Sequence, residues 1–246
     1  MTASLPMYDT GTTRSANDRL WALIRKHLGR GPLELDRETD PHDTWDASDL
    51  ILSQTCGLPY RSELHGRVAL VGTPDYGVRG CPPGYYKSYL VVRKDDPRRD
   101  LASFAGATLA RNDVRSQSGW AAVEGHLSES DFGFSFVGNT TDTGGHARSA
   151  QAVHAGQADI ASLDAVTWTL IKREMPMAKE LRVLTSTRPT PGLPFITSKG
   201  ADTQTMFEAI TRAIQELSAR DRAKLLLKGL VAIPASTYLA EPLPPA

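Results

Sequence analysis

The chain has 246 residues, of which 40% are hydrophobic, and its 28 basic and 28 acidic residues give a formal net charge of zero. This length permits a sizeable core, either in one large domain or in two lobes of about 100 residues each. The balanced charge, and the lack of a Lys/Arg cluster interleaved with aromatic residues, argue against nucleic acid as a partner. No apolar run approaches the ~20 residues of a membrane-spanning helix, so we expect no membrane insertion.

The N-terminal region is predicted to form a strand and then a helix. Leu5–Tyr8 reads as the strand, and the helix has a capping box at residues 15–18 and a stop at Gly29. Tyr8 therefore ends a strand, where its phenol can donate to an anion. The alternative is a buried structural tyrosine with one satisfied hydroxyl. Leu33–Leu35 is predicted as a weak second strand.

An acid-rich segment, Asp36–Asp49, contains His42 and is predicted to be a loop with a short helix. No second histidine lies nearby, so we expect no metal site there, and we expect no cofactor elsewhere. Leu50–Ser53 is the next predicted strand and Val68–Gly72 the one after it. The first of these ends at a polar segment that includes Thr55, which we expect to face a ligand.

A two-residue alternation over residues 85–93 predicts a strand. One face of this strand carries Tyr86, Ser88, Leu90 and Val92. A charged break at Lys94–Arg99 and the stretch Thr187–Pro194, with three prolines, fit the points where the chain enters and leaves a second lobe. We therefore expect a discontinuous first lobe of residues 1–92 and 188–246, and a second lobe of residues 93–187.

The second lobe contains a predicted strand at Thr108–Ala110, a turn at Asn112, and a helix that begins at Ser116-Gln117-Ser118-Gly119. A helix start leaves free N–H groups and carries the positive end of the helix dipole, so two hydroxyls placed there make a site for a small oxyanion. The alternative is that Ser116 only caps the helix and Ser118 only occupies its first turn.

Two further predicted helices begin at residues able to bind a ligand. His146 follows Thr143-Gly144-Gly145, and Asp164 follows a short strand at Ile160–Leu163. In an open α/β sheet such helix starts follow the carboxyl ends of strands, where ligands bind. A hydrolase built on Ser116 or Ser118 with His146 and Asp164 is disfavoured, because the sequence has no Gly-x-Ser-x-Gly elbow.

The spacing of these segments is similar to that of a known family. The similarity rests on Asn112 with the Ser-x-Ser-Gly helix start, on Gly144-Gly145-His146 with the helix after it, and on Pro191-Gly192-Leu193-Pro194-Phe195. Over nearly its whole length the chain resembles the phosphate/phosphonate-type substrate-binding proteins of ABC transporters. The resemblance implies a type II periplasmic-binding-protein fold, an α/β fold of two lobes. Each lobe would be an open mixed sheet flanked by helices, and hinge strands would join the two.

The resemblance also implies roles for particular residues. In that family the serines and amides of the Ser-x-Ser-Gly helix start hold the phosphonate oxygens, a histidine at the position of His146 assists, and an acidic residue, here Asp164, can hold a ligand amine. The strand that crosses between lobes would place Tyr86 and Ser88 beside the ligand, unless both only pack under the hinge. The full expected ligand set is Tyr8, Thr55, Tyr86, Ser88, Asn112, Ser116, Gln117, Ser118, Gly119, His146 and Asp164.

The expected function is binding of a small oxyanion, such as phosphate or phosphonate, in the cleft between the lobes. Hinge closure without covalent chemistry is the expected mechanism. The protein would act as a monomer with an ABC permease as its partner, or as a leaderless relative of such proteins. The alternative is a cytosolic enzyme on the same fold, such as a chorismate-dehydratase-like biosynthetic lyase, which would need a general base in the cleft.

The N-terminus and the cysteines bear on location. Met1–Tyr8 has no basic n-region and no long apolar h-region, so the chain as written is predicted to be cytoplasmic, or periplasmic if it is a mature form. A disulfide between Cys56 and Cys81 would stabilise an exported protein by about 3 kcal/mol on the chain-entropy model, whereas a cytoplasmic protein keeps its thiols reduced. The sequence leaves this bridge open.

Overall fold

The computed structural model describes residues 1–130 and 136–244, and the chain divides into two compact units. Unit 1 comprises Met1–Tyr85 and Pro191–Ala240, and unit 2 comprises Tyr86–Thr190 and the chain from Glu241 onward. The residues just before the expected boundary at position 93 form β5 (Ser88–Arg93), which pairs along its length within the sheet of unit 2. Tyr86 and Ser88 therefore belong to the same unit as the Ser-x-Ser-Gly helix start.

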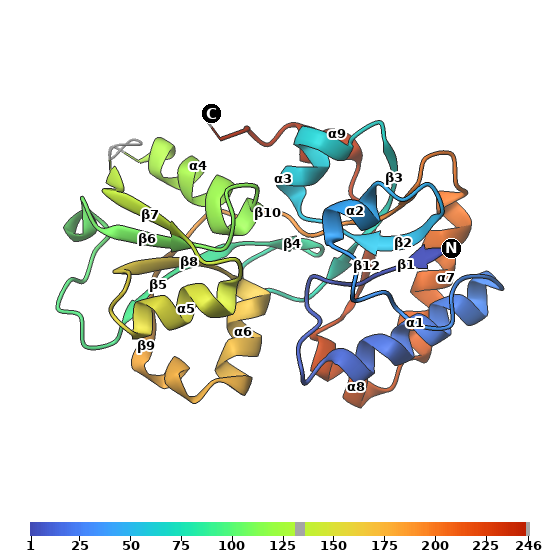
Figure 1. The fold of residues 1–246 in the computed structure, drawn as a ribbon, viewed down its shortest axis with the longest axis horizontal. Coiled ribbons are helices and arrows are strands. Elements are labelled where there is room, and N and C mark those ends of the chain that lie inside the picture. The colour runs from blue at the N-terminus through green and yellow to red at the C-terminus, as the bar shows by residue number, and fades with distance from the viewer. Residues whose placement is uncertain (131–135, 245–246) are drawn as a thin grey trace. The chain divides into compact units, whose positions relative to one another are not determined.

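Unit 1 is built on a five-stranded mixed sheet (Figure 1). In spatial order its strands are β1 (Thr2–Ala3), β2 (Leu50–Gln54), β11 (Phe195–Ser198), β3 (Val68–Asp75) and β12 (Gly229–Val231). The first two strands pair in parallel, and the other neighbours pair antiparallel. β11 lies between β2 and β3, so a strand from the second segment of unit 1 completes a sheet whose other central strands come from the N-terminal segment.

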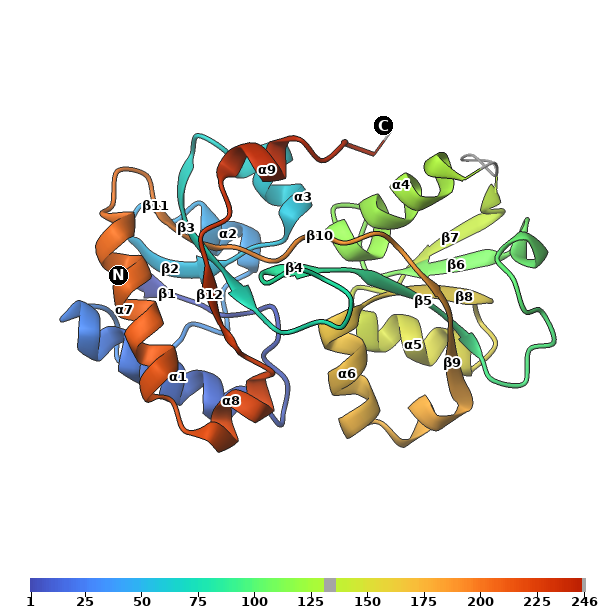
Figure 2. The ribbon, with the colours of Figure 1, turned by 180° about the vertical axis from the view of Figure 1, so that it is seen from behind.

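Helices cover both faces of the unit 1 sheet, as Figure 2 shows from behind. One face is covered by α1 (Arg14–Leu28), α7 (Thr203–Glu216) and α8 (Ala219–Leu225). The other is covered by α2 (Pro41–Trp45), α3 (Gly57–Pro59), the π-helix η1 (Tyr60–Leu64) and α9 (Ala235–Leu239). Phe195 packs into the first core and its neighbour Ile196 into the second, as the two-residue period of a strand requires.

Unit 2 has a second five-stranded mixed sheet. In spatial order its strands are β7 (Asn139–Asp142), β6 (Thr108–Arg111), β8 (Ile160–Asp164), β5 (Ser88–Arg93) and β9 (Leu181–Ser186). β6 pairs in parallel with both of its neighbours, whereas β5 pairs antiparallel with both of its own. The elements that follow β6, β7 and β8 therefore start at one edge of this sheet.

Helices also cover both faces of the unit 2 sheet (Figure 1). They are the 3₁₀ helix η2 (Ala102–Phe104), the π-helix η3 (Gln117–Ala121) with α4 (Ala122–Glu129), α5 (His146–His154), α6 (Ala165–Glu174) and the 3₁₀ helix η5 (Pro176–Glu180). Leu90 and Val92 pack on the α4 side, whereas Val91 packs on the α5 side. The alternation predicted from residues 85–93 is confirmed.

The chain passes between the units at two short strands that pair with each other, β4 (Tyr85–Tyr86) and β10 (Thr190–Pro191). The backbone approaches itself closely beside them, because the N–H of Gly192 donates to the carbonyl of Gly84 at 2.8 Å. A Cβ atom at position 192 would lie 2.6 Å from that carbonyl oxygen, so only glycine fits there.

Three local predictions for the N-terminal region are wrong. The first strand is Thr2–Ala3 rather than Leu5–Tyr8, since the pairing with β2 ends after Ser4 and Pro6 has no N–H to continue it. No strand forms at Leu33–Leu35. The capping box is also wrong, because α1 starts one residue before Ser15.

Candidate functional site

The best-supported site begins at the loop between β6 and η3 in unit 2. Ser116 is the N-cap of η3, and its hydroxyl oxygen accepts the N–H of Gly119 at 3.0 Å. The backbone carbonyl of Ser116 accepts the amides of Trp120 and Ala121, the first bonds of the helical segment. The amides of the first turn precede these bonds, so they lie where a helix has donors without helical acceptors. Anions are stabilised at such a position.

The side chain of Asn112 packs closely against Gly119. A Cβ atom on Gly119 would lie 1.8 Å from the side-chain oxygen of Asn112, so a side chain at position 119 requires Asn112 to move. That oxygen is buried and has no hydrogen-bond partner among the described residues. The backbone carbonyl of Asn112 accepts the N–H of Gly144 at 2.8 Å, which ties this loop to the loop before α5. Asn112 therefore positions the helix start by packing against Gly119.

His146, the first residue of α5, contacts the second serine. Its Nε2 lies 2.9 Å from the hydroxyl oxygen of Ser118, and its Nδ1 lies 3.2 Å from the carbonyl oxygen of Ser162. A carbonyl can only accept, so Nδ1 carries the proton of the neutral ring and Nε2 accepts from Ser118. Burial lowers the pKa of His146 to about 4, which keeps this ring neutral at physiological pH.

Two buried hydroxyls hold the backbone of Ser118. Ser88 donates to the carbonyl of Ser118 at 2.8 Å, and Ser162 donates to the same carbonyl at 2.6 Å. Ser88 and Ser162 are 1% and 0% exposed, so neither exchanges this bond for water. The hydroxyl proton of Ser88 is thus engaged by the protein, and Ser88 acts on the site through Ser118. Ser162 was not among the residues predicted from the sequence, although a serine inside an otherwise apolar buried strand is a usable signal.

Asp164 has a structural role as the N-cap of α6. One oxygen of its buried carboxylate accepts the amides of Val166 at 2.6 Å and Thr167 at 2.9 Å, so it caps α6. The Nδ1 of His146 faces the carbonyl of Ser162 instead of a carboxylate. The Ser/His/Asp arrangement of a hydrolase is therefore not assembled by these residues.

The helix α4, which follows η3, contains a buried glutamate, Glu124. Glu124 on α4 is 6% exposed, and burial raises the pKa of its carboxyl to about 6, while the charge of Arg111 acts in the opposite direction. The guanidinium of Arg111 lies over the ring of Trp120 at 4.1 Å from its centroid and pairs with Asp142. Neither Arg111 nor Glu124 was predicted from the sequence to belong to the site.

The other expected ligand residues are buried away from solvent. In unit 1, Tyr8 is 7% exposed with its ring edge-to-face on Tyr76, and Thr55 is fully buried. In unit 2, Tyr86 of β4 is 2% exposed. The contacts of Tyr8, Thr55 and Tyr86 with a ligand stay predictions. Cys56 and Cys81 are both thiols, so the bridge that the sequence left open is not formed.

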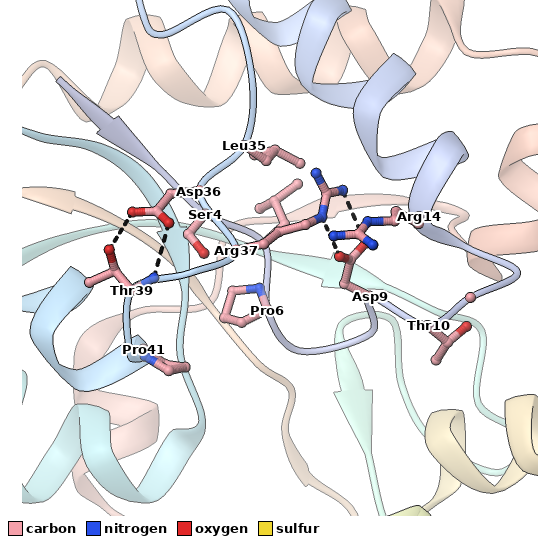
Figure 3. Close-up of a pocket in the computed structure, with 12 residues that line it drawn as sticks. Ser4, Pro6, Asp9, Thr10, Arg14, Leu35, Asp36, Arg37, Thr39 and Pro41 are labelled. Atoms are coloured by element: carbon pink, nitrogen blue, oxygen red, sulfur yellow. Dashed lines mark hydrogen bonds and ion pairs between the residues drawn. The ribbon is translucent and has the colours of Figure 1, made fainter.

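Unit 1 contains a cavity of about 330 Å³, whose lining residues are drawn in Figure 3. Nε of Arg37 donates to Asp9 at 2.6 Å, and its Nη2 donates to Asp18 at 2.7 Å. The carboxylate of Asp36 accepts from the amide and the hydroxyl of Thr39, which lowers its pKa. Two arginines and two aspartates line the cavity, and their formal charges cancel. We therefore place the candidate oxyanion site in unit 2.

The described part of the chain contains neither a candidate membrane-spanning helix nor a candidate cluster of metal-binding side chains. Within residues 1–130 and 136–244, no helix combines the length and the apolar character needed to cross a membrane. Over the same residues, no group of three or more His, Cys, Asp or Glu side chains is arranged to hold a metal ion.

Comparison with solved structures shows the fold class. PhnD1 from Prochlorococcus marinus in complex with methylphosphonate is 14% identical, with a TM-score of 0.74 over 96% of this chain and 94% of that one. A binding protein component of an ABC phosphonate transporter from Pseudomonas aeruginosa is 16% identical, with a TM-score of 0.71 over 97% and 82%. A Xanthomonas citri protein bound to ATP is 16% identical, with a TM-score of 0.69 over 96% and 92%. The fold is that of the type II periplasmic binding proteins.

The sequence itself identifies the family. Residues 55–236 match the family described as ABC transporter, phosphonate, periplasmic substrate-binding protein. A comparison with curated proteins gave no match. The chain belongs to this family of phosphonate-type substrate-binding proteins, whose members bind small ligands and work with ABC permeases.

Proposed function

We propose that this chain binds a small oxyanion, a phosphonate, phosphate or similar group, as the solute-binding component of an ABC-type uptake system. The observation that carries the proposal is the contact of 2.9 Å between Ser118 Oγ and His146 Nε2 at the start of η3. It brings a hydroxyl, an imidazole and first-turn amides together at the positive end of a helical segment. Membership of the phosphonate-type family supports both the ligand class and the permease partner.

The proposed ligand contacts are Ser116, Gln117 and Ser118, while Gly119 and His146 hold the two serine hydroxyls in place. The Ser116 hydroxyl accepts from Gly119, and its own proton has no acceptor among the described residues, so it is available to a ligand oxygen. Hydrogen bonds to a charged group contribute about 1.5–3 kcal/mol each. A few such bonds supply the affinity that an uptake protein needs without a cation in the site.

We further propose that binding occurs without catalysis and that the protein is a monomer. A lyase on this fold needs a free general base, whereas the lone pair of His146 Nε2 already takes the proton of Ser118. Asp164, the nearest carboxylate of the expected set, is engaged as a helix cap. Turnover of a bound ligand, followed by mass spectrometry, would overturn the first statement, and light scattering on the purified protein tests the second.

Calorimetric titration with methylphosphonate, phosphate and acetate tests the proposed function. A specific ligand at 100 times its dissociation constant should also stabilise the protein by about 2.7 kcal/mol. The double variant Ser116→Ala/Ser118→Ala should lose at least about tenfold in affinity, since 1.4 kcal/mol corresponds to that factor.

Ser218→Ala is the matched control. Ser218 caps α8 in unit 1 through the same type of bond, from its hydroxyl oxygen to the N–H of Asp221 at 3.1 Å. This control should reduce stability by about 1 kcal/mol and leave oxyanion affinity unchanged. An unchanged affinity in the double variant would return Ser116 and Ser118 to a purely structural capping role.

A further inference from the structure

The order of protons along the Ser118, His146 and Ser162 chain restricts what Ser118 can offer a ligand. The Ser162 carbonyl accepts from Nδ1 of His146, so Nε2 has only a lone pair. The hydroxyl proton of Ser118 is then directed at Nε2. A serine hydroxyl has one proton, and that of Ser118 is donated to His146. Toward any further partner, Ser118 Oγ can act only as an acceptor.

The surroundings of His146 favour the neutral ring. Burial is the main cause of its low pKa. The elements packed against α5 also carry Arg173, Glu174 and Lys179. Six other charged residues on α5 and on these elements are engaged with other groups: Arg148 with the Thr143 and Gly144 carbonyls, Asp164 with the α6 amides, Arg111 with Asp142, Arg93 with Asp95 and Asp96, Glu180 with His154, and Lys172 with the Trp168 ring.

Ser118 itself cannot turn away easily. Its backbone carbonyl is held by the hydroxyls of Ser88 and Ser162, and the residue is 3% exposed. An oxyanion with no proton would meet a lone pair on Ser118 Oγ, which repels it. An oxyanion that retains one proton can donate to the same atom, while its other oxygens accept from the first-turn amides and from Ser116.

We propose that the site selects oxyanions by a single proton: it takes the hydrogen-phosphonate monoanion, whose P–OH donates to Ser118 Oγ, in preference to a sulfonate of the same shape and charge. This inference rests on the proposed oxyanion function of the same site. A site built to pair a ligand hydroxyl discriminates against the analogue that lacks it, because a buried polar group is then left unpaired. Ser118 is thus the residue that determines specificity, and His146 acts by keeping its proton.

Methylphosphonate and methanesulfonate are the probes, measured by titration calorimetry below the second pKa of methylphosphonate and above the pKa of His146. Both are then monoanions with one methyl group and three oxygens on a tetrahedral centre, and they differ by one proton. The wild-type protein should bind methylphosphonate at least about tenfold more tightly, which corresponds to 1.4 kcal/mol. Equal affinities would overturn the inference and leave the oxyanion function standing. If neither probe bound, the proposed function itself would fail.

Two variants test the acceptor role of Ser118 separately from the donor role of Ser116. Ser118→Ala removes the acceptor, so the preference should fall below about threefold. Ser116→Ala removes a donor that both probes use, so both affinities should fall while the preference remains. A full preference in Ser118→Ala would overturn the role of Ser118. Circular dichroism and thermal melting show whether each variant is folded.

A measurement on the wild-type protein does not depend on any variant. In the complex with methylphosphonate, ¹⁵N chemical shifts of the labelled histidine ring should show Nε2 of His146 unprotonated, as in the free protein. A protonated Nε2 in the complex would overturn the inference, because the extra proton would then reside on His146 and Ser118 could donate to the ligand.

Discussion

Nε2 of His146 lies 2.9 Å from the hydroxyl oxygen of Ser118, although 28 positions separate the two residues in the sequence. They meet because β6 and β7 are parallel neighbours, so the segments that follow the two strands start at one edge of the sheet. One of those segments leads to η3 and the other to α5. The contact therefore depends on strand pairing as much as on either residue.

The neutral state of His146 predicts a loss of stability in acid. The folded-state pKa is about 4 and the unfolded value is 6.5, so the unfolded chain binds more protons between these values. Stability should fall by about 1–3 kcal/mol as the pH drops through this window, and this contribution should be constant above it. Urea titrations of wild type and His146→Gln at several pH values check this. Parallel curves for the two proteins would exclude His146 as the cause.

Ionisation of Glu124 should lower stability as the pH rises, which is the opposite of the pH effect expected for His146. Its folded-state pKa is raised from 4.5 to about 6, so ionisation costs stability as the pH rises through that range. Glu124→Gln should be more stable than wild type by about 2 kcal/mol at pH near 8 and equal to it at pH near 4. Glu129→Gln is the control, since its carboxylate is 56% exposed in a pair with Arg188 and should change stability by less than about 1 kcal/mol. A destabilised Glu124→Gln at high pH would contradict this account.

Position 119 should accept a side chain only if the side chain of Asn112 moves. Gly119→Ala would place Cβ 1.8 Å from the Asn112 side-chain oxygen and should cost about 1–3 kcal/mol of unfolding free energy, because Asn112 has to move. Adding Asn112→Ala should restore part of the loss. Gly125→Ala on α4 is the matched control, because no atom of the described residues lies within 4 Å of its new Cβ and the change should stabilise the helix by about 0.5–1 kcal/mol. Urea denaturation measures all four proteins, and equal costs at the two glycines would refute the steric argument.

Substitutions of Ser88 and Ser162, which both donate to the Ser118 carbonyl, should have non-additive effects on the free energy of unfolding. Ser88→Ala or Ser162→Ala alone leaves one hydroxyl on that carbonyl and should cost about 1 kcal/mol. The double variant leaves a buried carbonyl without a donor, so its cost should exceed the sum by about 1 kcal/mol. A double-mutant cycle in unfolding free energy tests this, and strict additivity would show that the carbonyl finds another donor.

The pair of Asp9 and Arg37 in unit 1 should matter more than an exposed pair. Their side chains are 12% and 18% exposed, and Arg37→Met should cost about 1–3 kcal/mol because Asp9 is left partly buried with a charge. Lys26→Met, which breaks a pair with Glu216 at 64% and 40% exposure, should cost less than about 1 kcal/mol. Thermal or urea unfolding of both variants measures the difference, and equal effects would remove the argument from burial.

Local sequence determined a large part of the fold. The alternation in residues 85–93, the glycine stop at Gly29 and the helix starts at Ser116 and His146 depend on neighbours along the chain, and all are present in the structure. The family pattern also gave the type II fold class. Local signals failed at Leu5–Tyr8, where pairing with β2 decides which residues form the strand.

Tertiary structure decided the chemistry of the candidate site. The sequence contains Ser118, His146 and Ser162, but a proton order along them exists only once β6, β7 and β8 pair side by side. The low pKa of His146 comes from burial, which no spacing of residues reveals. The hydroxyls of Ser88 and Ser162 converge on one carbonyl because antiparallel pairing sets β5 beside β8. Hydrogen-bond partners distant in sequence are chosen by sheet register, and register is a property of the folded chain.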